Sequence, residues 1–406
     1  MSGSRAQRLA ARRAGRRRAA RRGAMVAAAS LVVAAGAVAG VLAAFEDGRA
    51  SDEAAPPEVS SSPRLAPLPA EPPPSAPATA ASASPSPSPS PSARRTPGPA
   101  PSRTGTKRER TGTVAGRLYR HPDSQVLAWV RSHSGDPRHA VIASRIAEQP
   151  AAVWFADYSP DTVTARVAAV TSGGAALGRV PVVVPYAIPG RDCGGHSQGG
   201  APDLDAYDAW IDRFAAGLGS GEVIVVLEPD SVAQTECLSA GDRADRFASL
   251  ARAGRVLKAA NPRARVYFDA GHSGWNPPGT QAAWLRQAGA ASPESSDGVF
   301  SNVSNFHTTA DEVAYDRRVL DALGGPAGLG AVIDTSRNGN GAPPDGEWCD
   351  PSGRRLGRTP TLSTGESRID AYLWVKLPGE SDGCKGRPGT FTASYAYDLA
   401  SSDSAS

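Results

Sequence analysis

The sequence predicts an α/β fold: a distorted, partly open parallel (β/α) barrel of about seven strands, built as a single domain. From about residue 113 onward, short apolar segments alternate with longer helical segments, the order that a parallel sheet with crossover helices requires. The segment Val223–Leu227 is apolar at every position, as expected for a strand covered on both faces. Polar clusters follow the strand segments, where parallel barrels carry their functional side chains.

The expected strands and helices alternate regularly along the chain. The strands are residues 152–155, 180–186, 223–227, 265–268, 298–301, 329–333 and 371–375. The helices are residues 123–132, 137–148, 162–177, 204–218, 240–260, 280–288 and 311–323. The fourth helix has one apolar face with helical spacing, formed by Tyr207, Trp210, Ile211 and Phe214. We expect this face to lie in the core.

Residues 1–45 have the features of a signal peptide or signal anchor. Seven arginines between Arg12 and Arg22 precede an uncharged, mostly apolar run from Ala24 to Phe45, which predicts export. The run is long for a cleaved signal, and it is weakly apolar for a membrane span because it is rich in Ala and Gly. A single-pass anchor with the arginines inside is therefore the alternative. The last two arginines of the cluster also allow a twin-arginine route.

Residues 46–112 form a Pro/Ser/Ala-rich segment, and residues 113–406 form the expected folded domain. The first segment is expected to be a disordered linker, because it cannot bury enough apolar surface to offset its ordering entropy. Of 44 Lys+Arg and 40 Asp+Glu, residues 1–112 hold 17 and 7, so the folded domain carries a net charge of −6. Its surface should repel phosphates, which argues against nucleic acid as a partner.

Candidate functional residues stand where strands end. Val223–Leu227 runs into Glu228-Pro229-Asp230, and Pro229 ends the ladder so that both acids stay at the strand's mouth. A lone Asp in this place more often caps the next helix. Acids also follow other strands, however, and the carboxyl ends of parallel strands meet at one rim. We therefore expect one cleft ringed by four carboxylates, Asp192, Asp230, Asp269 and Asp382.

Five motifs in a fixed order resemble glycoside hydrolase family 6, cellulases that include inverting β-1,4-glucanases and cellobiohydrolases. They are Tyr186 with Pro189-Gly190-Arg191-Asp192-Cys193, Glu228-Pro229-Asp230, Asp269-Ala270-Gly271-His272, Asp334-Thr335-Ser336-Arg337-Asn338-Gly339, and Trp374-Val375-Lys376 with Glu380-Ser381-Asp382-Gly383. The resemblance covers essentially all of residues 113–400. It implies that residues 113–406 are the catalytic domain of a glycoside hydrolase.

The resemblance implies roles for the motif residues. Asp230 would be the general acid, Asp192 the carboxylate that raises the pKa of this acid, and Asp382 the candidate base. The residues implied in binding the glucan are Tyr186, Trp154, His272, Trp275, Asn305, Trp374, Lys376 and Glu380. The implied supporting residues are Arg191, Asp269, Arg337, Ser197 and Gln198. The chemistry agrees, because an acid must keep its proton near neutral pH, and burial or a like charge raises its pKa.

The four cysteines of the chain, Cys193, Cys237, Cys349 and Cys384, permit three pairings. The resemblance implies the bridges Cys193–Cys237 and Cys349–Cys384, each of which would fix a loop at the rim. Free buried thiols are the alternative, and export argues against them.

One loop position departs from the family pattern. Relatives carry a serine six residues after the aspartate that corresponds to Asp192, whereas this chain has Gln198, with Ser197 one residue earlier. Because glycines make the loop pliable, either side chain can hold the attacking water. The proton would then pass through water to Asp192 or Asp382.

Together these features predict a secreted, monomeric, inverting β-1,4-glucanase that cuts internal bonds of cellulose or related β-glucans, with no cofactor or metal. Internal cutting follows from the Cys–Cys intervals, which are short compared with those of tunnel-forming family members; a cellobiohydrolase is the alternative. A metal-dependent polysaccharide hydrolase or deacetylase is a second alternative, although no metal-binding spacing accompanies its candidate ligands, His196, Asp192, Asp269 and His272. A glucan-binding protein without catalysis is a third.

Overall fold

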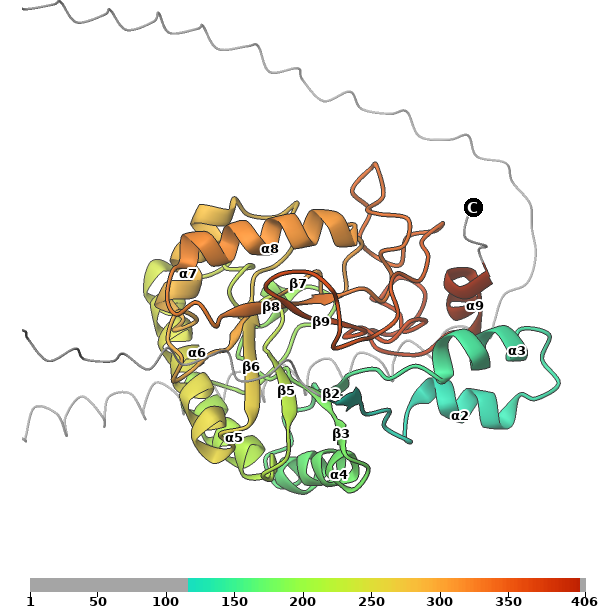
Figure 1. The fold of residues 1–406 in the computed structure, drawn as a ribbon, viewed down its shortest axis with the longest axis horizontal. Coiled ribbons are helices and arrows are strands. Elements are labelled where there is room, and N and C mark those ends of the chain that lie inside the picture. The colour runs from blue at the N-terminus through green and yellow to red at the C-terminus, as the bar shows by residue number, and fades with distance from the viewer. Residues whose placement is uncertain (1–115, 402–406) are drawn as a thin grey trace, which may run out of the picture. The chain divides into compact units, whose positions relative to one another are not determined.

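The computed structural model describes residues 116–401. The predicted signal, residues 1–45, and the predicted linker, residues 46–112, lie outside these residues. Within the described part, seven parallel strands form one sheet in the order β2-β4-β5-β6-β7-β8-β9 (Figure 1). Their bounds are β2 Val153–Phe155, β4 Val182–Pro185, β5 Val223–Leu227, β6 Ala264–Asp269, β7 Gly298–Ser301, β8 Gly330–Asp334 and β9 Ile369–Leu373. A separate pair of parallel strands is formed by β1 Arg117–Leu118 and β3 Arg179–Val180.

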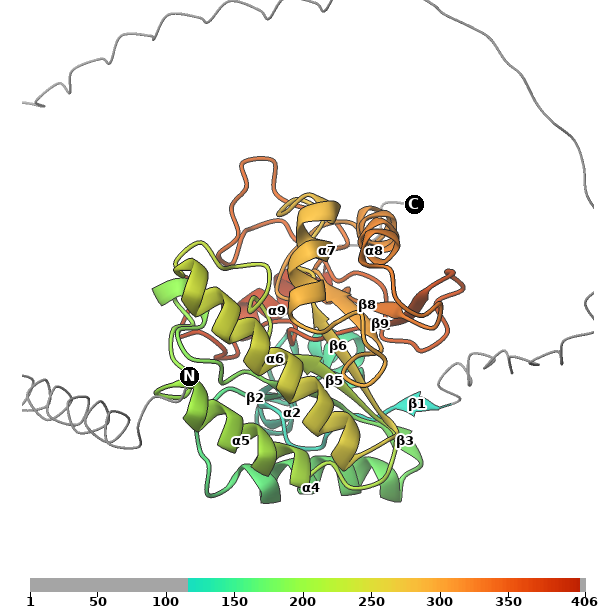
Figure 2. The ribbon, with the colours of Figure 1, turned by 90° about the vertical axis from the view of Figure 1, so that its left-hand side faces the viewer.

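The seven-stranded sheet curls into a barrel that does not close. Each strand pairs with the next one in the order, whereas the edge strands β2 and β9 do not pair with each other. Near this seam, the backbone N–H of Ala152 donates to the carbonyl of Trp374 at 2.9 Å. Figure 2 shows helices α4 to α8 along the outside of the sheet. The predicted fold, a partly open parallel barrel of seven strands, is therefore confirmed.

The helices mostly begin where the sequence indicates. They are α2 Gln125–Ser132, α3 His139–Ile142, η1 Ala143–Ala147, α4 Val163–Ala176, η2 Asp192–Gly194, α5 Leu204–Ala216, α6 Ala240–Ala260, α7 Pro278–Gln287, α8 Thr309–Leu323 and α9 Ala393–Ser401. The side chains of Asp203 and Ser239 accept hydrogen bonds from backbone N–H groups in the first turns of α5 and α6. Such caps satisfy donors that a first turn leaves unpaired, so these two helices start at the predicted residues.

The strand β5 shows how the sheet is buried on both faces. Its five side chains are all buried. Val223, Val225 and Leu227 pack against the helices outside the sheet. Ile224 and Val226 point to the other face and pack against residues of other strands inside the barrel. The predicted apolar face of α5 completes the outer layer and is fully buried, with members Tyr207, Trp210, Ile211 and Phe214.

Three predicted elements differ from the structure. The strand expected at 180–186 is split into β3 and β4 at Pro181, which has no backbone N–H to donate. The helix expected at 137–148 is the short α3 followed by the π-helical turn η1. The last strand, expected at 371–375, ends at Leu373, so Trp374 lies beyond it.

Candidate active site

The carboxyl ends of the strands open into a cleft of about 1410 Å³. Asp192 in the loop after β4, Asp230 in the turn after β5 and Asp382 in the segment after β9 all line it. Parallel strands bring these three segments to one rim, as expected. Asp269 is buried and does not line the cleft, so the predicted ring of four carboxylates contains three.

The turn after β5 is held by the acid that precedes Pro229. Glu228 and Asp230 have φ angles of 49° and 68°, a region that residues other than glycine seldom adopt. Glu228 is fully buried, and one of its carboxylate oxygens accepts hydrogen bonds from the N–H groups of Ala187 and Ile188, both at 2.9 Å. Glu228 thus ties this turn to the end of β4, and Asp230 is the acid left to face the cleft.

Asp269 supports the same turn from below. Its Oδ2 accepts hydrogen bonds from the N–H groups of Val232 at 3.0 Å and Ala233 at 2.7 Å. Its Oδ1 accepts a hydrogen bond from the N–H of Gly271 at 2.9 Å. The carboxylate therefore fixes the chain that follows Asp230 and places a negative charge beneath it.

Asp230 lies in surroundings that favour its protonated form. Burial and the negative charges of Asp269 and Asp192 raise the pKa of Asp230 to about 8, while a hydrogen bond with Tyr186 acts in the opposite direction. No ion pair among residues 116–401 includes Asp230. A carboxyl group that keeps its proton near neutral pH can act as a general acid.

Asp192 is held by the loop that carries it. Its Oδ2 accepts a hydrogen bond from the N–H of Ser197 at 2.6 Å, which closes the loop on itself. Arg191 donates to the carbonyls of Ser197 and Ala156, both at 2.8 Å, and also to that of Tyr186. The guanidinium group of Arg191 lies 4.3 Å from the centroid of the Tyr186 ring. Arg191 thus joins the loop to the ends of β2 and β4.

Asp382 lies in surroundings of the opposite kind. Its Oδ2 lies 2.7 Å from Nη1 of Arg337, and its Oδ1 lies 3.2 Å from Nζ of Lys376. The N–H of Asp350 also donates to Oδ2 at 3.1 Å. Arg337 is fully buried and Asp382 is 8% exposed. Two ion pairs, one with Arg337 and one with Lys376, therefore hold this carboxylate in place.

Asp350, which belongs to none of the sequence motifs, shapes the segment around Asp382. Its carboxylate accepts hydrogen bonds from the N–H of Asp382 at 2.7 Å and from the hydroxyl of Ser381 at 2.6 Å. The N–H groups of Cys384 and Lys385 donate to it at 3.0 and 2.8 Å. The one available signal was its place directly after a bridging cysteine.

Both predicted disulfides are confirmed, and they pair all four cysteines of the chain. The bridge Cys193–Cys237 joins the loop that carries Asp192 to the segment after β5. The bridge Cys349–Cys384 joins the long β8–β9 connection to the segment that carries Asp382. Each bridge therefore fixes a loop at the rim of the cleft.

Most of the residues expected to bind a glucan line the cleft. Those are Tyr186, Trp154, His272, Trp275, Asn305, Lys376 and Glu380, and the supporting residues Arg191, Ser197 and Gln198 line it as well. Nε1 of Trp154 donates to the carbonyl of Val375 at 2.7 Å, which fixes the indole ring edge-on to Tyr186. His272 stacks on His307, with ring centroids 4.3 Å apart.

The prediction that Trp374 binds the glucan is wrong. Its side chain is 2% exposed, packs in a core cluster and donates from Nε1 to the carbonyl of Arg358 at 3.0 Å. Trp348, which the sequence analysis did not single out, is 53% exposed and lines the cleft. Its ring lies 5.7 Å from that of His196. A tryptophan in a loop without a strand pattern carries no signal of its exposure, so only the structure reveals this ring.

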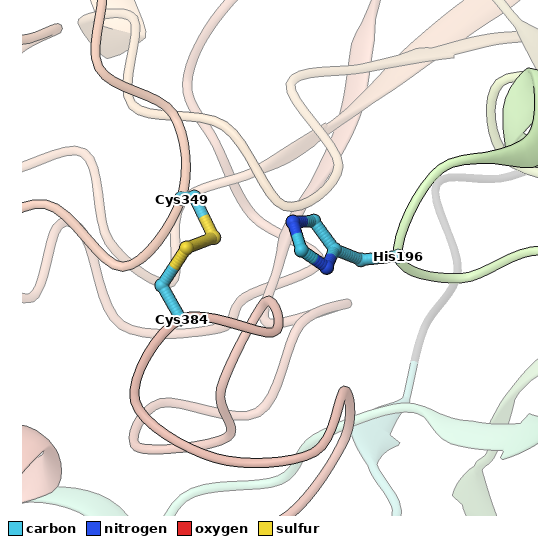
Figure 3. Close-up of side chains that lie close together, drawn as sticks. All are labelled: His196, Cys349 and Cys384. Carbon is cyan, nitrogen blue, oxygen red and sulfur yellow. A yellow bond between two sulfur atoms is a disulfide. The ribbon is translucent and has the colours of Figure 1, made fainter.

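One group of potential metal ligands occurs among residues 116–401, formed by His196, Cys349 and Cys384 within 4.8 Å of one another (Figure 3). The two sulfur atoms are bonded to each other, and a disulfide is not the thiolate that binds a metal. The set suggested by the sequence does not assemble either. Its Asp269 already accepts three backbone hydrogen bonds below the cleft.

The curled parallel sheet, the protonated acid and the aromatic cleft define a hydrolase of the polysaccharide-cleaving class. The profile of Glycosyl hydrolases family 6 matches residues 113–404. The chain belongs to this family, as its motifs predict.

The relatives agree with this placement. "Endoglucanase 1" of Streptomyces sp. (strain KSM-9) is 53% identical over 284 residues, which is 70% of this chain and 77% of that protein. "Endoglucanase A" of Thermobispora bispora is 49% identical over 284 residues, 70% of this chain and 61% of that protein. A solved structure, the endoglucanase Cel6 from Mycobacterium tuberculosis in complex with methyl-cellobiosyl-4-deoxy-4-thio-β-D-cellobioside, is 38% identical with a TM-score of 0.66. It covers 71% of this chain and 98% of that chain.

Proposed function

We propose that this protein is an inverting endo-β-1,4-glucanase. The observation that carries the proposal is that one cleft holds a carboxyl group with a raised pKa and a second carboxylate in ion pairs with two cations. Asp230 has a raised pKa and no cation partner among the described residues, whereas Asp382 lies between Arg337 and Lys376. An inverting glycosidase needs an acid for the leaving oxygen and a second carboxylate, beyond a water molecule, for the nucleophile.

The residues take the following roles. Asp230 donates its proton to the leaving oxygen, and Asp192, whose charge raises the pKa of Asp230, accepts a proton through water from the attacking molecule. Asp382 forms ion pairs with Arg337 and Lys376, and its part is to supply negative charge near the developing sugar cation. Trp154, Trp275 and Trp348 offer aromatic faces for glucosyl rings.

The endo mode is supported by the names of the relatives and by the loops. Four relatives with 41–53% identity are named endoglucanases. Three relatives with 31% identity are named "Probable 1,4-beta-D-glucan cellobiohydrolase C", and one with 28% identity is named "Putative endoglucanase type B". The two disulfides enclose sequence separations of only 44 and 35 residues, which leaves little chain to roof the cleft.

Two measurements test the proposal. The viscosity of carboxymethylcellulose should fall early relative to the release of reducing ends, because internal cuts shorten chains rapidly. Release of mainly cellobiose with little loss of viscosity favours the exo reading. NMR of early products from a cello-oligosaccharide should show the α-anomer, and an initial β-anomer excludes inversion. A chelator should leave the rate unchanged if the reaction needs no metal.

We also propose that the protein is exported and acts as a monomer. The chain pairs all of its cysteines, as proteins of oxidising compartments do. Within residues 116–401, no helix is long and apolar enough to cross a membrane. The arginine-rich segment at residues 1–45 is the predicted export signal or anchor. Fractionation of an expressing culture, with sizing of the secreted protein by light scattering, tests both points.

A further inference from the structure

Two acids of α8, Glu312 and Asp316, are buried outside the cleft. Both side chains are fully buried, and their spacing of four residues places them on the same face of the helix. No ion pair among the described residues includes either one. The mechanism proposed above does not use them.

Each carboxyl group has one bonded and one unpartnered oxygen. Oε1 of Glu312 accepts a hydrogen bond from the N–H of Ser273 at 2.8 Å. Oδ2 of Asp316 accepts a hydrogen bond from the hydroxyl of Ser301 at 3.0 Å. The other oxygens, Oε2 of Glu312 and Oδ1 of Asp316, are buried without a hydrogen-bond partner. Burying a carboxylate oxygen without a hydrogen-bond donor costs free energy, unless the carboxyl group or its neighbour carries a proton.

The groups around the pair supply no compensating charge. Near the pair, the carboxylates of Asp269 and Asp334 accept backbone hydrogen bonds. Arg286 donates to carbonyls at the far end of α8. Burial lowers the pKa values of His272 and His307. On α8 itself, Arg317 forms an ion pair with Glu366, and Arg318 lowers the pKa of Tyr315. The hydroxyl group of Tyr315 donates a hydrogen bond to the carbonyl of Ala270. Asp311 adds a further negative charge near Glu312. Two adjacent buried carboxylates without a cation cannot both stay ionised.

We propose that Glu312 and Asp316 share one proton, and that this pair positions the loop of residues 271–275. The loop contact is the hydrogen bond from Ser273 to Glu312, and the neighbouring side chains of His272 and Trp275 line the cleft. The pair thus acts on the glucan through the loop without touching the glucan. The sharing of the proton does not depend on the proposed function. The effect of the pair on substrate binding does depend on it.

The shared proton makes stability depend on pH. Burial raises the pKa of Glu312 from 4.5 to about 7, and burial together with the charge of Glu312 raises that of Asp316. The folded state therefore binds the proton more tightly than the unfolded chain does. This contribution to stability is complete below the unfolded pKa of about 4.5, and it is lost as the pH rises through about 7.

Equilibrium unfolding in urea, measured between about pH 5 and about pH 8, tests the proton. One extra bound proton makes the unfolding constant rise by up to about tenfold per pH unit. Glu312→Gln and Asp316→Asn should each flatten this dependence relative to the wild type. Asp321→Asn is the matched control: it lies on the same helix with its side chain 71% exposed, and its slope should equal that of the wild type. Equal slopes in all four proteins overturn the proposal.

Kinetics on cello-oligosaccharides test the positioning. Glu312→Ala should raise KM by about tenfold with a smaller change in kcat, because the loop that binds substrate loses its anchor. Glu312→Gln keeps an acceptor for the N–H of Ser273 and should restore KM. An unchanged KM in Glu312→Ala contradicts the positioning role. If the protein proves inactive on glucans, the unfolding titration still decides whether the proton is shared.

Discussion

Asp230 and Asp382 face the same cleft from surroundings of opposite kinds. Burial and the charges of two nearby acids raise the pKa of Asp230, which has no cation partner in the described chain. Asp382 has a buried guanidinium group at 2.7 Å and an ammonium group at 3.2 Å. The two side chains are chemically identical, so only their surroundings distinguish the acid with the raised pKa from the carboxylate held in ion pairs.

The contrast extends to the way each side is held. The Asp230 side is held by carboxylates that accept backbone N–H groups, Glu228 and Asp269, which support the turn and add negative charge. On the Asp382 side the support comes from cations and from Asp350. The same fold thus holds Asp230 among acids and Asp382 among cations.

Removal of the proton donor should have the largest effect. Asp230→Ala should lower kcat on cellulose derivatives by about 10²–10⁴-fold, since general acid catalysis contributes about that factor. Reducing-sugar release measures the rate, and circular dichroism checks that the fold is intact. Turnover near that of the wild type on unactivated glucans would remove Asp230 from the role of acid.

Removal of the anion should cost activity and stability together. Asp382→Ala leaves Arg337 buried without its anion, which should lower the free energy of unfolding by about 3–5 kcal/mol. We expect kcat to fall by about a hundredfold, because the negative charge near the developing sugar cation is lost. Asp230→Asn, measured in parallel at pH 7, should keep or gain stability because no cation loses a partner. Equal destabilisation by both changes would show that Asp230 and Asp382 do not differ in their contribution to stability.

Most of this architecture was predictable from the sequence, because its signals are local. A five-residue apolar run predicts β5, and the acids at strand ends follow from the geometry of parallel sheets. The roles of Asp192 and Asp382 came from the motifs of the family, and they remain proposals. Both disulfides were implied by the same motifs, and the structure confirms them.

The missed features depend on contacts between distant segments. Trp374 follows an apolar strand and resembles a rim residue, but β9 ends at Leu373 and the indole ring turns into the core. Asp269 has a strand-end position like that of Asp230, yet three backbone N–H groups take up its carboxylate. Trp348 lies in an irregular loop, where no periodicity indicates exposure.

The pH dependence of kcat/KM should follow the protonation of Asp230. The acid must be protonated, so kcat/KM should hold up to about pH 8 and then fall about tenfold per pH unit. Asp192→Asn removes a negative charge that raises the pKa of Asp230, so it should shift this alkaline limb to lower pH. An unshifted limb in Asp192→Asn would show that the two carboxylates are not coupled.

The smallest effects are expected in the loop that carries Asp192. Ser197 holds Asp192 through its backbone N–H at 2.6 Å, and its carbonyl accepts from Arg191 at 2.8 Å. Ser197→Ala keeps both contacts and removes only the hydroxyl group, and Gln198→Ala removes only an exposed amide. If either side chain holds the attacking water, each change should lower kcat by about tenfold, or roughly 1.4 kcal/mol of barrier. Single-turnover rates of both variants and of the double variant measure this. A double variant with the wild-type rate would show that the proton reaches Asp192 without help from these side chains.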